Sequence, residues 1–185
     1  MGISMQGDRK KGTGYEAMCS PWVRLRGIKM KKAIWIVLVF LWMSTIFWFS
    51  SKPAEQSSEM SMSVGKTVGE IFVKDFSSLT KEKQMEFTEN IDYFVRKTAH
   101  FTEYTVLGIL LACMYATFGF GGKRHFLFSA ASGIFYAATD EFHQLFVVGR
   151  SGRCSDVLLD GCGIIAGLGL YIICKKTGQR RKTSL

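Results

Sequence analysis

The sequence predicts an all-α membrane protein with four transmembrane helices, both termini cytoplasmic, and amphipathic external helices between spans one and two. Three observations support this fold class: four long apolar runs, Lys and Arg concentrated at their flanks, and helical spacing of apolar residues in the polar segment after the first run. The chain has 185 residues, of which 48% are hydrophobic and 21% charged. Because both fractions are large, the apolar and charged residues must be segregated along a single domain.

Each of the four apolar runs is long enough to approach or complete a bilayer crossing, which takes about 20 helical residues. The first run is the shortest and has the length of a signal-peptide core. Its long preceding tail, its Trp and Phe content and the lack of a clean cleavage site favour a retained signal anchor. The expected spans are residues 33–49, 98–120, 126–148 and 157–174.

The basic residues predict the orientation, because cytoplasmic loops of membrane proteins carry an excess of Lys and Arg. The tail of residues 1–32 has 8 Lys or Arg against 2 acids, and the tail of residues 175–185 has 5 against none. We expect both tails to be cytoplasmic and to flank a membrane domain of residues 33–174. Basic residues that flank apolar runs favour membrane-protein loops over a nucleic-acid-binding surface.

The external segment of residues 50–97 carries two apolar stripes at helical spacing. These stripes predict amphipathic helices that cover the bundle or lie in the membrane interface, rather than a separate binding domain. The second stripe continues into the span at 98–120, so that helix is predicted to begin before the membrane. The apolar residues are Met60, Val64, Val68, Ile71 and Phe72 in the first stripe, and Phe87, Ile91, Phe94 and Val95 in the second.

The five cysteines predict neither a disulfide framework nor a zinc site, because they are odd in number and form no CxxC pair. Three of them lie in apolar runs, where Cys behaves as a small hydrophobe. Cys154, in a polar stretch, is the candidate exposed thiol. The cysteines are Cys19, Cys113, Cys154, Cys162 and Cys174.

Ionisable residues from three of the predicted spans converge at the outer end of the membrane domain. Charges in spans normally face the bundle interior or water, so we expect an outward-facing polar pocket. Gly163 and Gly167 form a small-xxx-small pattern that permits close helix approach. Helical spacing places on one face of each span His100, Glu103, Tyr104 and Leu107; Asp140, His143 and Gln144; and Asp156, Asp160, Gly163 and Gly167.

The residues leave two non-catalytic interpretations of this cluster open. As a binding pocket, Lys97, Arg150 and Arg153 would meet the carboxylate or phosphate groups of an envelope lipid, a cell-wall precursor or a drug. As a purely structural network, Arg150 and Arg153 would pair with Glu141, Asp156 or Asp160, and His100 would donate to Asp140.

A third interpretation is a membrane-embedded hydrolase or transferase that acts on an envelope lipid. His100 with Asp140 or Glu103 would form its general base, and Glu141 is a further catalytic candidate. His100-x-x-Glu103 facing Asp140-x-x-His143 also resembles the carboxylate and His helices that hold metals in bundles. Since the usual order is reversed in one helix, we expect no bound metal and no cofactor. Four spans argue against a small monomeric transporter.

Two blocks, KTAHFTEYTVLG at 97–108 and DEFHQLFVVGRSGRCSDVLLDGCGIIAG at 140–167, resemble the VanZ-like family of bacterial membrane proteins. The resemblance covers about residues 35–174. Val148 stands where Pro is common in the family, and Asp160 stands where Asn is frequent. The polar set that the resemblance implies as ligand-binding is Lys97, His100, Glu103, Tyr104, Asp140, Glu141, Gln144, Arg150, Asp156 and Asp160.

The resemblance also implies a location and partners. The family is named for a protein associated with glycopeptide resistance of the teicoplanin type, so it implies a multi-pass protein of the bacterial cytoplasmic membrane that acts at the outer envelope. The implied partners are membrane lipids and a cell-wall precursor or glycopeptide antibiotic, with no nucleic acid.

Overall fold

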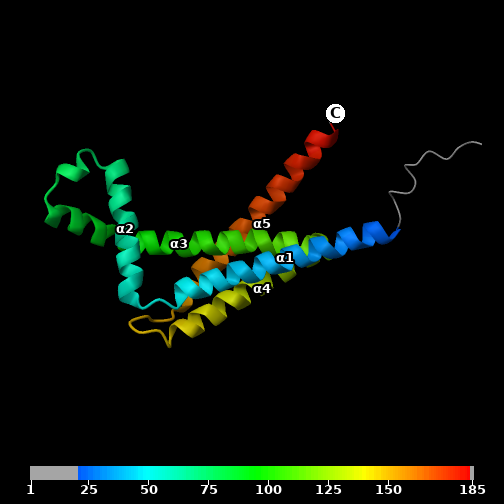
Figure 1. Cartoon of the computed structure of the whole chain (residues 1–185), viewed down its shortest axis with the longest axis horizontal. Coiled ribbons are helices and arrows are strands. Elements are labelled where there is room, and N and C mark those ends of the chain that lie inside the picture. Colours follow the sequence, from blue (N-terminus) through cyan, green and yellow to red (C-terminus); the bar gives the residue numbers. More distant parts are fainter. Residues whose placement is uncertain (1–20, 184–185) are drawn as a thin grey trace, which may run out of the picture.

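The computed structural model describes residues 21–183, which form five α-helices and one short 3₁₀-helix, with no strand in that range (Figure 1). The predicted all-α class is therefore confirmed. Residues 1–20 of the basic tail, with Cys19, lie outside the described residues. The elements are α1 (Pro21–Ser50), α2 (Ala54–Phe72), η2 (Phe76–Ser78), α3 (Lys81–Thr117), α4 (Gly122–Gln144) and α5 (Cys154–Thr183).

Three of these helices are long and apolar enough to cross a membrane: Lys29–Ser50 in α1, Lys81–Thr117 in α3 and Cys154–Arg180 in α5. They contain most or all of three of the predicted spans. The fourth predicted span, at 126–148, coincides with α4 but is helical only as far as Gln144. Ser and Gly residues and two acids lower the hydropathy of α4, so its crossing of the membrane stays a prediction.

α3 is the central helix, in contact with α1, α2, α4 and α5. In Figure 1, α1 and α4 run alongside it, α2 crosses one end of the bundle, and the C-terminal part of α5 diverges from the rest. The buried core joins side chains of α1, α3 and α5, including Ile46, Leu107 and Ile164. Large apolar side chains also cover the outside of the bundle, such as Phe135, which is 72% exposed. An apolar exterior is expected of helices that face lipid.

Close packing of α3 against α5 depends on three glycines. A Cβ atom added to Gly163 would lie 2.6 Å from the carbonyl oxygen of Phe101, and one added to Gly108 would lie 2.5 Å from that of Ile164. A Cβ atom at Gly167 would collide with the carbonyl oxygen of Thr105. The glycine pair expected to permit close helix approach therefore does so in this interface.

The first stripe lies on α2, the helix between α1 and α3. α2 packs on α3 through its small residues, and Ser61 Oγ donates a hydrogen bond to the Asp92 carboxylate. The second stripe belongs to α3 itself, which begins at Lys81 after the N-cap Thr80. The predicted start of this helix before the apolar run is therefore confirmed.

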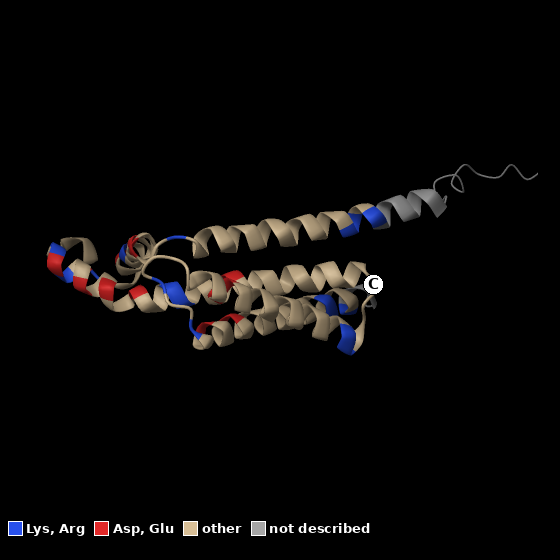
Figure 2. Cartoon of the chain, turned by 90° about the horizontal axis from the view of Figure 1, so that it is seen from below, with Lys and Arg blue, Asp and Glu red and all other residues tan. Residues whose placement is uncertain are grey.

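Charge is distributed unevenly between the two ends of the bundle. Figure 2 shows Asp and Glu of the described residues only toward the end where α2 lies, whereas the opposite end carries Lys and Arg alone. The polar residues of α3, α4 and α5 therefore meet at one end of an otherwise apolar bundle.

We expect Gly167→Ala to lower the free energy of unfolding by about 1–3 kcal/mol, because the added methyl group has no space against the backbone of α3. Thermal unfolding of the detergent-purified protein measures the effect. Gly169→Ala is the matched control, since a Cβ atom at Gly169 meets nothing within 4 Å on the same helix. Equal melting temperatures for the two variants would contradict this account of the α3–α5 interface.

Candidate functional site

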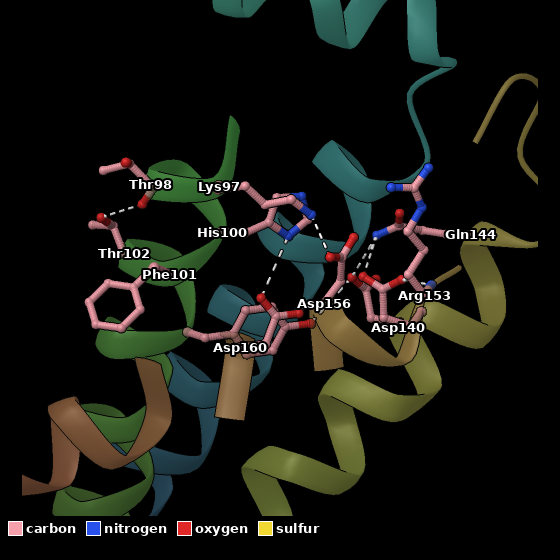
Figure 3. Close-up of polar contacts among 12 residues, drawn as sticks. Lys97, Thr98, His100, Phe101, Thr102, Asp140, Gln144, Arg153, Asp156 and Asp160 are labelled. Carbon is pink, nitrogen blue, oxygen red and sulfur yellow. Dashed lines mark hydrogen bonds and ion pairs between the residues drawn. The ribbon is translucent and has the colours of Figure 1, made fainter. Parts of the chain in front are cut away.

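The centre of the candidate site is formed by His100 of α3, Glu141 of α4 and Asp160 of α5. One ligand atom of each residue lies within 4.8 Å of the other two. Figure 3 shows the His100 ring directed from α3 toward Asp160, and the two side chains are 3.8 Å apart between Nδ1 and Oδ1. Three residues that are distant in the sequence therefore meet where three helices converge.

Asp160 is fully buried but has no hydrogen-bond partner for either carboxylate oxygen among the described residues. His100 Nδ1 and Asp140 Oδ1 are likewise buried without a hydrogen bond in that part of the chain. Burying such groups unpaired is costly, and most native structures contain few of them. The site is therefore not a fully satisfied structural network.

The neighbouring carboxylates of α4 are better satisfied. Asp140 accepts hydrogen bonds from Tyr104 Oη at 3.2 Å and from Gln144 Nε2 at 3.4 Å. Glu141 accepts from Gln144 Nε2 at 3.4 Å and from the backbone N–H of Arg153 at 3.1 Å. These contacts fix the orientation of Glu141, because each of its oxygens has a donor.

The ion pairs differ from those expected for a structural network. Lys97 Nζ, rather than an arginine, pairs with Asp156 Oδ1 at 2.5 Å across the α3–α5 interface. Arg153 contacts Glu141 through its backbone, and its side chain contacts Ser151. The arginine side-chain pairs of the structural interpretation are not formed among the described residues, and Lys97 faces Asp156 directly across the two helices instead.

Arg150 instead joins the loop after α4 to the end of α1. Its Nε donates to the carbonyl oxygen of Lys52 at 3.0 Å, and its terminal nitrogens lie 3.5 Å from Gln144 Oε1 and the carbonyl oxygen of Phe49. No carboxylate of the described residues lies within 4.0 Å of this guanidinium. Burial lowers the pKa of Arg150, opposed by the charge of Asp140. A partly desolvated cation without a close anion is a suitable anion-binding group.

Two residues of the predicted faces lie outside this centre. Glu103, expected as a partner of His100, lines the pocket under α2 together with His100. The contact that His100 Nδ1 makes is nevertheless with Asp160, rather than with Glu103 or Asp140. His143 turns toward α1, with Nε2 3.2 Å from Ser51 Oγ and its ring 4.5 Å from that of Phe47. The predicted base pairs of His100 with Glu103 or Asp140 are therefore not formed.

Two adjoining pockets open beside the centre. The first, about 290 Å³, lies between α1, α2 and α3, and much of its wall is apolar. The second, about 220 Å³, has a largely polar wall from α3, α5 and the loop before α5. Both are lined by Arg96, His100 and Arg150. The apolar residues of the first pocket include Ile46, Phe49, Met60, Val64 and Val95.

Sequence reasoning missed two cations of these pockets, Lys52 and Arg96. Arg96 lies one helical turn before His100, so the helical spacing that linked His100 to Glu103 was a signal that could have identified it. It forms an i,i+4 ion pair with Asp92 at 2.7 Å. Lys52 follows α1 in the turn before α2, where no periodic pattern points to it.

Cys154 is exposed, as the sequence predicted, but Cys162 and Cys174 in the apolar run of α5 are exposed as well, so Cys154 is not the single exposed thiol. Four cysteines are free among the described residues: Cys113, Cys154, Cys162 and Cys174.

Comparison with known proteins identifies a family. The family model described as VanZ/LLP1 matches residues 35–175, which include every residue of the site described above. No curated protein and no solved structure matched the chain. The matched range covers most of the chain, and three of its helices are long and apolar enough to span a membrane. The chain is therefore a membrane protein that belongs to the VanZ family.

Proposed function

We propose that this VanZ-family protein binds an amphiphile with a phosphate-bearing headgroup at the outer face of the bacterial cytoplasmic membrane. The observation that carries the proposal is the pair of adjoining pockets that share Arg96, His100 and Arg150. An apolar tail fits the pocket under α2, and a charged headgroup fits the polar pocket beside it. Envelope lipids and lipid-linked cell-wall precursors both have this chemistry.

The charged side chains that line the pockets favour a ligand whose headgroup carries an anionic group next to a positively charged one. No carboxylate of the described residues lies within 4.0 Å of the Arg150 guanidinium, and Arg96 and Lys52 add two further cations to the lining of the apolar pocket. Acids remain nearby, since Glu103 lines the first pocket and Asp156 the second. A mixed site of this kind suits a zwitterionic or pyrophosphate-bearing ligand better than a simple phosphate.

The proposal includes a topology of four spans with both termini in the cytoplasm. α4 would be the remaining span, and its exposed Phe135 is consistent with contact with lipid. The end of the bundle with basic residues alone would face the cytoplasm, as the positive-inside rule requires. This orientation places α2 and both pockets at the outer surface, where glycopeptide drugs and cell-wall precursors meet.

Farnesyl pyrophosphate is a soluble probe of this site, because it joins an apolar tail to a charged headgroup. We expect it to bind the nanodisc-embedded protein more tightly than farnesol or inorganic pyrophosphate does. We expect Arg150→Gln to weaken its binding about 10- to 100-fold, as for loss of a charge-assisted hydrogen bond. Microscale thermophoresis in a chelator-containing buffer measures the dissociation constants.

The matched control for this experiment is Lys123→Gln, at the opposite end of the bundle, which should leave the affinity unchanged. A parallel titration with short-chain phosphatidylglycerol distinguishes a phospholipid ligand from a pyrophosphate-bearing precursor. Equal affinity of wild type and Arg150→Gln for both probes would refute the proposed site.

We further propose that the site contributes to survival in the presence of teicoplanin-type glycopeptides. Single Ala substitutions at His100, Glu141, Arg150 and Asp156 should leave the protein in the membrane at normal abundance and abolish that survival. Immunoblots of membrane fractions and drug-susceptibility assays in a bacterial host that expresses the chain measure the two effects. Lys123→Ala serves as the control.

The purely structural interpretation predicts a different outcome for the same four variants. If the polar residues only hold the helices together, all four proteins should be lost from the membrane fraction along with the phenotype. Full survival of cells that carry normally abundant variants would instead exclude a role of these residues in resistance.

A further inference from the structure

We propose that His100, Glu141 and Asp160 form a binding site for a divalent transition-metal cation of the Zn²⁺ or Mn²⁺ class. This inference goes beyond the proposed amphiphile-binding function and does not depend on it. The three side chains offer one imidazole nitrogen and two carboxylate groups from three different helices. Imidazole and carboxylate together suit these cations, whereas sites for Mg²⁺ and Ca²⁺ are built mainly from oxygen ligands.

The separations of the ligand atoms are close to those that a metal requires. With metal–ligand bonds of about 2.0–2.2 Å, neighbouring ligand atoms lie roughly 3–4 Å apart. His100 Nδ1 and Asp160 Oδ1 are separated by 3.8 Å, and all three ligand atoms lie within 4.8 Å of one another. A small rotation of the Glu141 or Asp160 side chain therefore suffices to bring the three ligands to one cation.

The Asp160 carboxylate supplies an independent observation. It is fully buried, and neither oxygen has a hydrogen-bond partner among the described residues. The nearby ammonium group of Lys97 pairs with Asp156. A cation between Asp160 and Glu141 would balance the charge of both carboxylates. It would also bind an oxygen of Asp160 and the Nδ1 atom of His100, which have no hydrogen bond among the described residues. Two of the three proposed ligands, Asp160 and His100, thus present buried atoms that have no hydrogen bond among the described residues, whereas Glu141 is held by its two donors.

The surroundings of Glu141 resemble the outer shell of a metal site. The backbone N–H of Arg153 and the Gln144 amide hold its two oxygens, and such contacts orient a ligating carboxylate. Three protein ligands leave at least one coordination position open, as in catalytic rather than structural zinc sites. His100 lines both pockets, whereas its Nδ1 atom, Glu141 and Asp160 are buried, so the metal would lie beneath the pocket wall.

This proposal departs from the expectation of a metal-free site that the sequence supported. Helical spacing in the sequence groups His100 with Glu103, Asp140 and His143. In the helix of His100, the histidine precedes the carboxylate, which is the reverse of the order in metal sites of helix bundles. The fold instead brings His100 to Glu141 and Asp160, and turns His143 away toward α1.

The full-length protein in detergent, stripped with a chelator and then dialysed against Zn²⁺ or Mn²⁺, tests the site. We expect about one equivalent of bound metal by elemental analysis and a higher melting temperature than in the metal-free protein. His100→Gln, Glu141→Gln and Asp160→Asn should each weaken metal binding at least 10-fold and abolish the gain in melting temperature. Mg²⁺ at the same concentration should produce a smaller gain.

Glu103→Gln is the matched control, because Glu103 lies one turn from His100 and outside the trio; it should keep wild-type metal binding. The metal-free melting temperature of Asp160→Asn should match or exceed that of the wild type, which separates lost metal binding from misfolding. Wild-type protein without bound metal, or equal losses in Glu103→Gln and Asp160→Asn, would overturn the proposal. Farnesyl pyrophosphate binding measured with chelator present shows separately whether the amphiphile site is intact.

Discussion

The close approach of α3 and α5 is the constraint on which the rest of the structure depends. Gly163 and Gly167 on α5 meet backbone carbonyl oxygens of α3, and Gly108 on α3 meets the backbone of α5. No larger residue fits at these points, so the two helices pack backbone to backbone. Asp160 and Asp156 lie on the same face of α5 as Gly163 and Gly167. Asp160 is one turn before Gly163, and Asp156 is two turns before it. The packing that brings the helices together therefore also brings these acids to Lys97 and His100.

The location of the acids explains how a membrane helix bundle tolerates them. They occupy one end of the bundle, where α2 crosses (Figures 1 and 2). His100 and Asp156 at this end line the polar pocket. Asp140 and Glu141 have hydrogen-bond donors from Tyr104, Gln144 and the backbone of Arg153, whereas Asp160 has none among the described residues. A site that satisfies some buried groups and leaves others open is typical of binding and catalytic centres rather than of structural networks.

α2 gives this site its amphiphilic character. Its apolar Met60 and Val64 form part of one pocket wall, and Arg150 from the loop after α4 lies at the boundary with the polar pocket. The guanidinium is held by carbonyl oxygens at the end of α1, so it is positioned before any ligand arrives. Preorganised donors of this kind lower the cost of binding, because less conformational freedom is lost.

The sequence by itself determined the all-α class, the positions of the apolar helices, the early start of α3 and the set of polar residues that meet at one end. These features follow from hydropathy and from the 3.6-residue period of a helix, which are local properties. The tertiary structure decided which of those residues touch: His100 with Asp160 rather than Asp140, Lys97 rather than an arginine with Asp156, and His143 with α1. Helical periodicity gives the face of a residue, but the rotation and depth of one helix against another depend on close packing between side chains distant in the sequence. The pockets under α2 and the grouping of His100, Glu141 and Asp160 therefore became visible only in the fold.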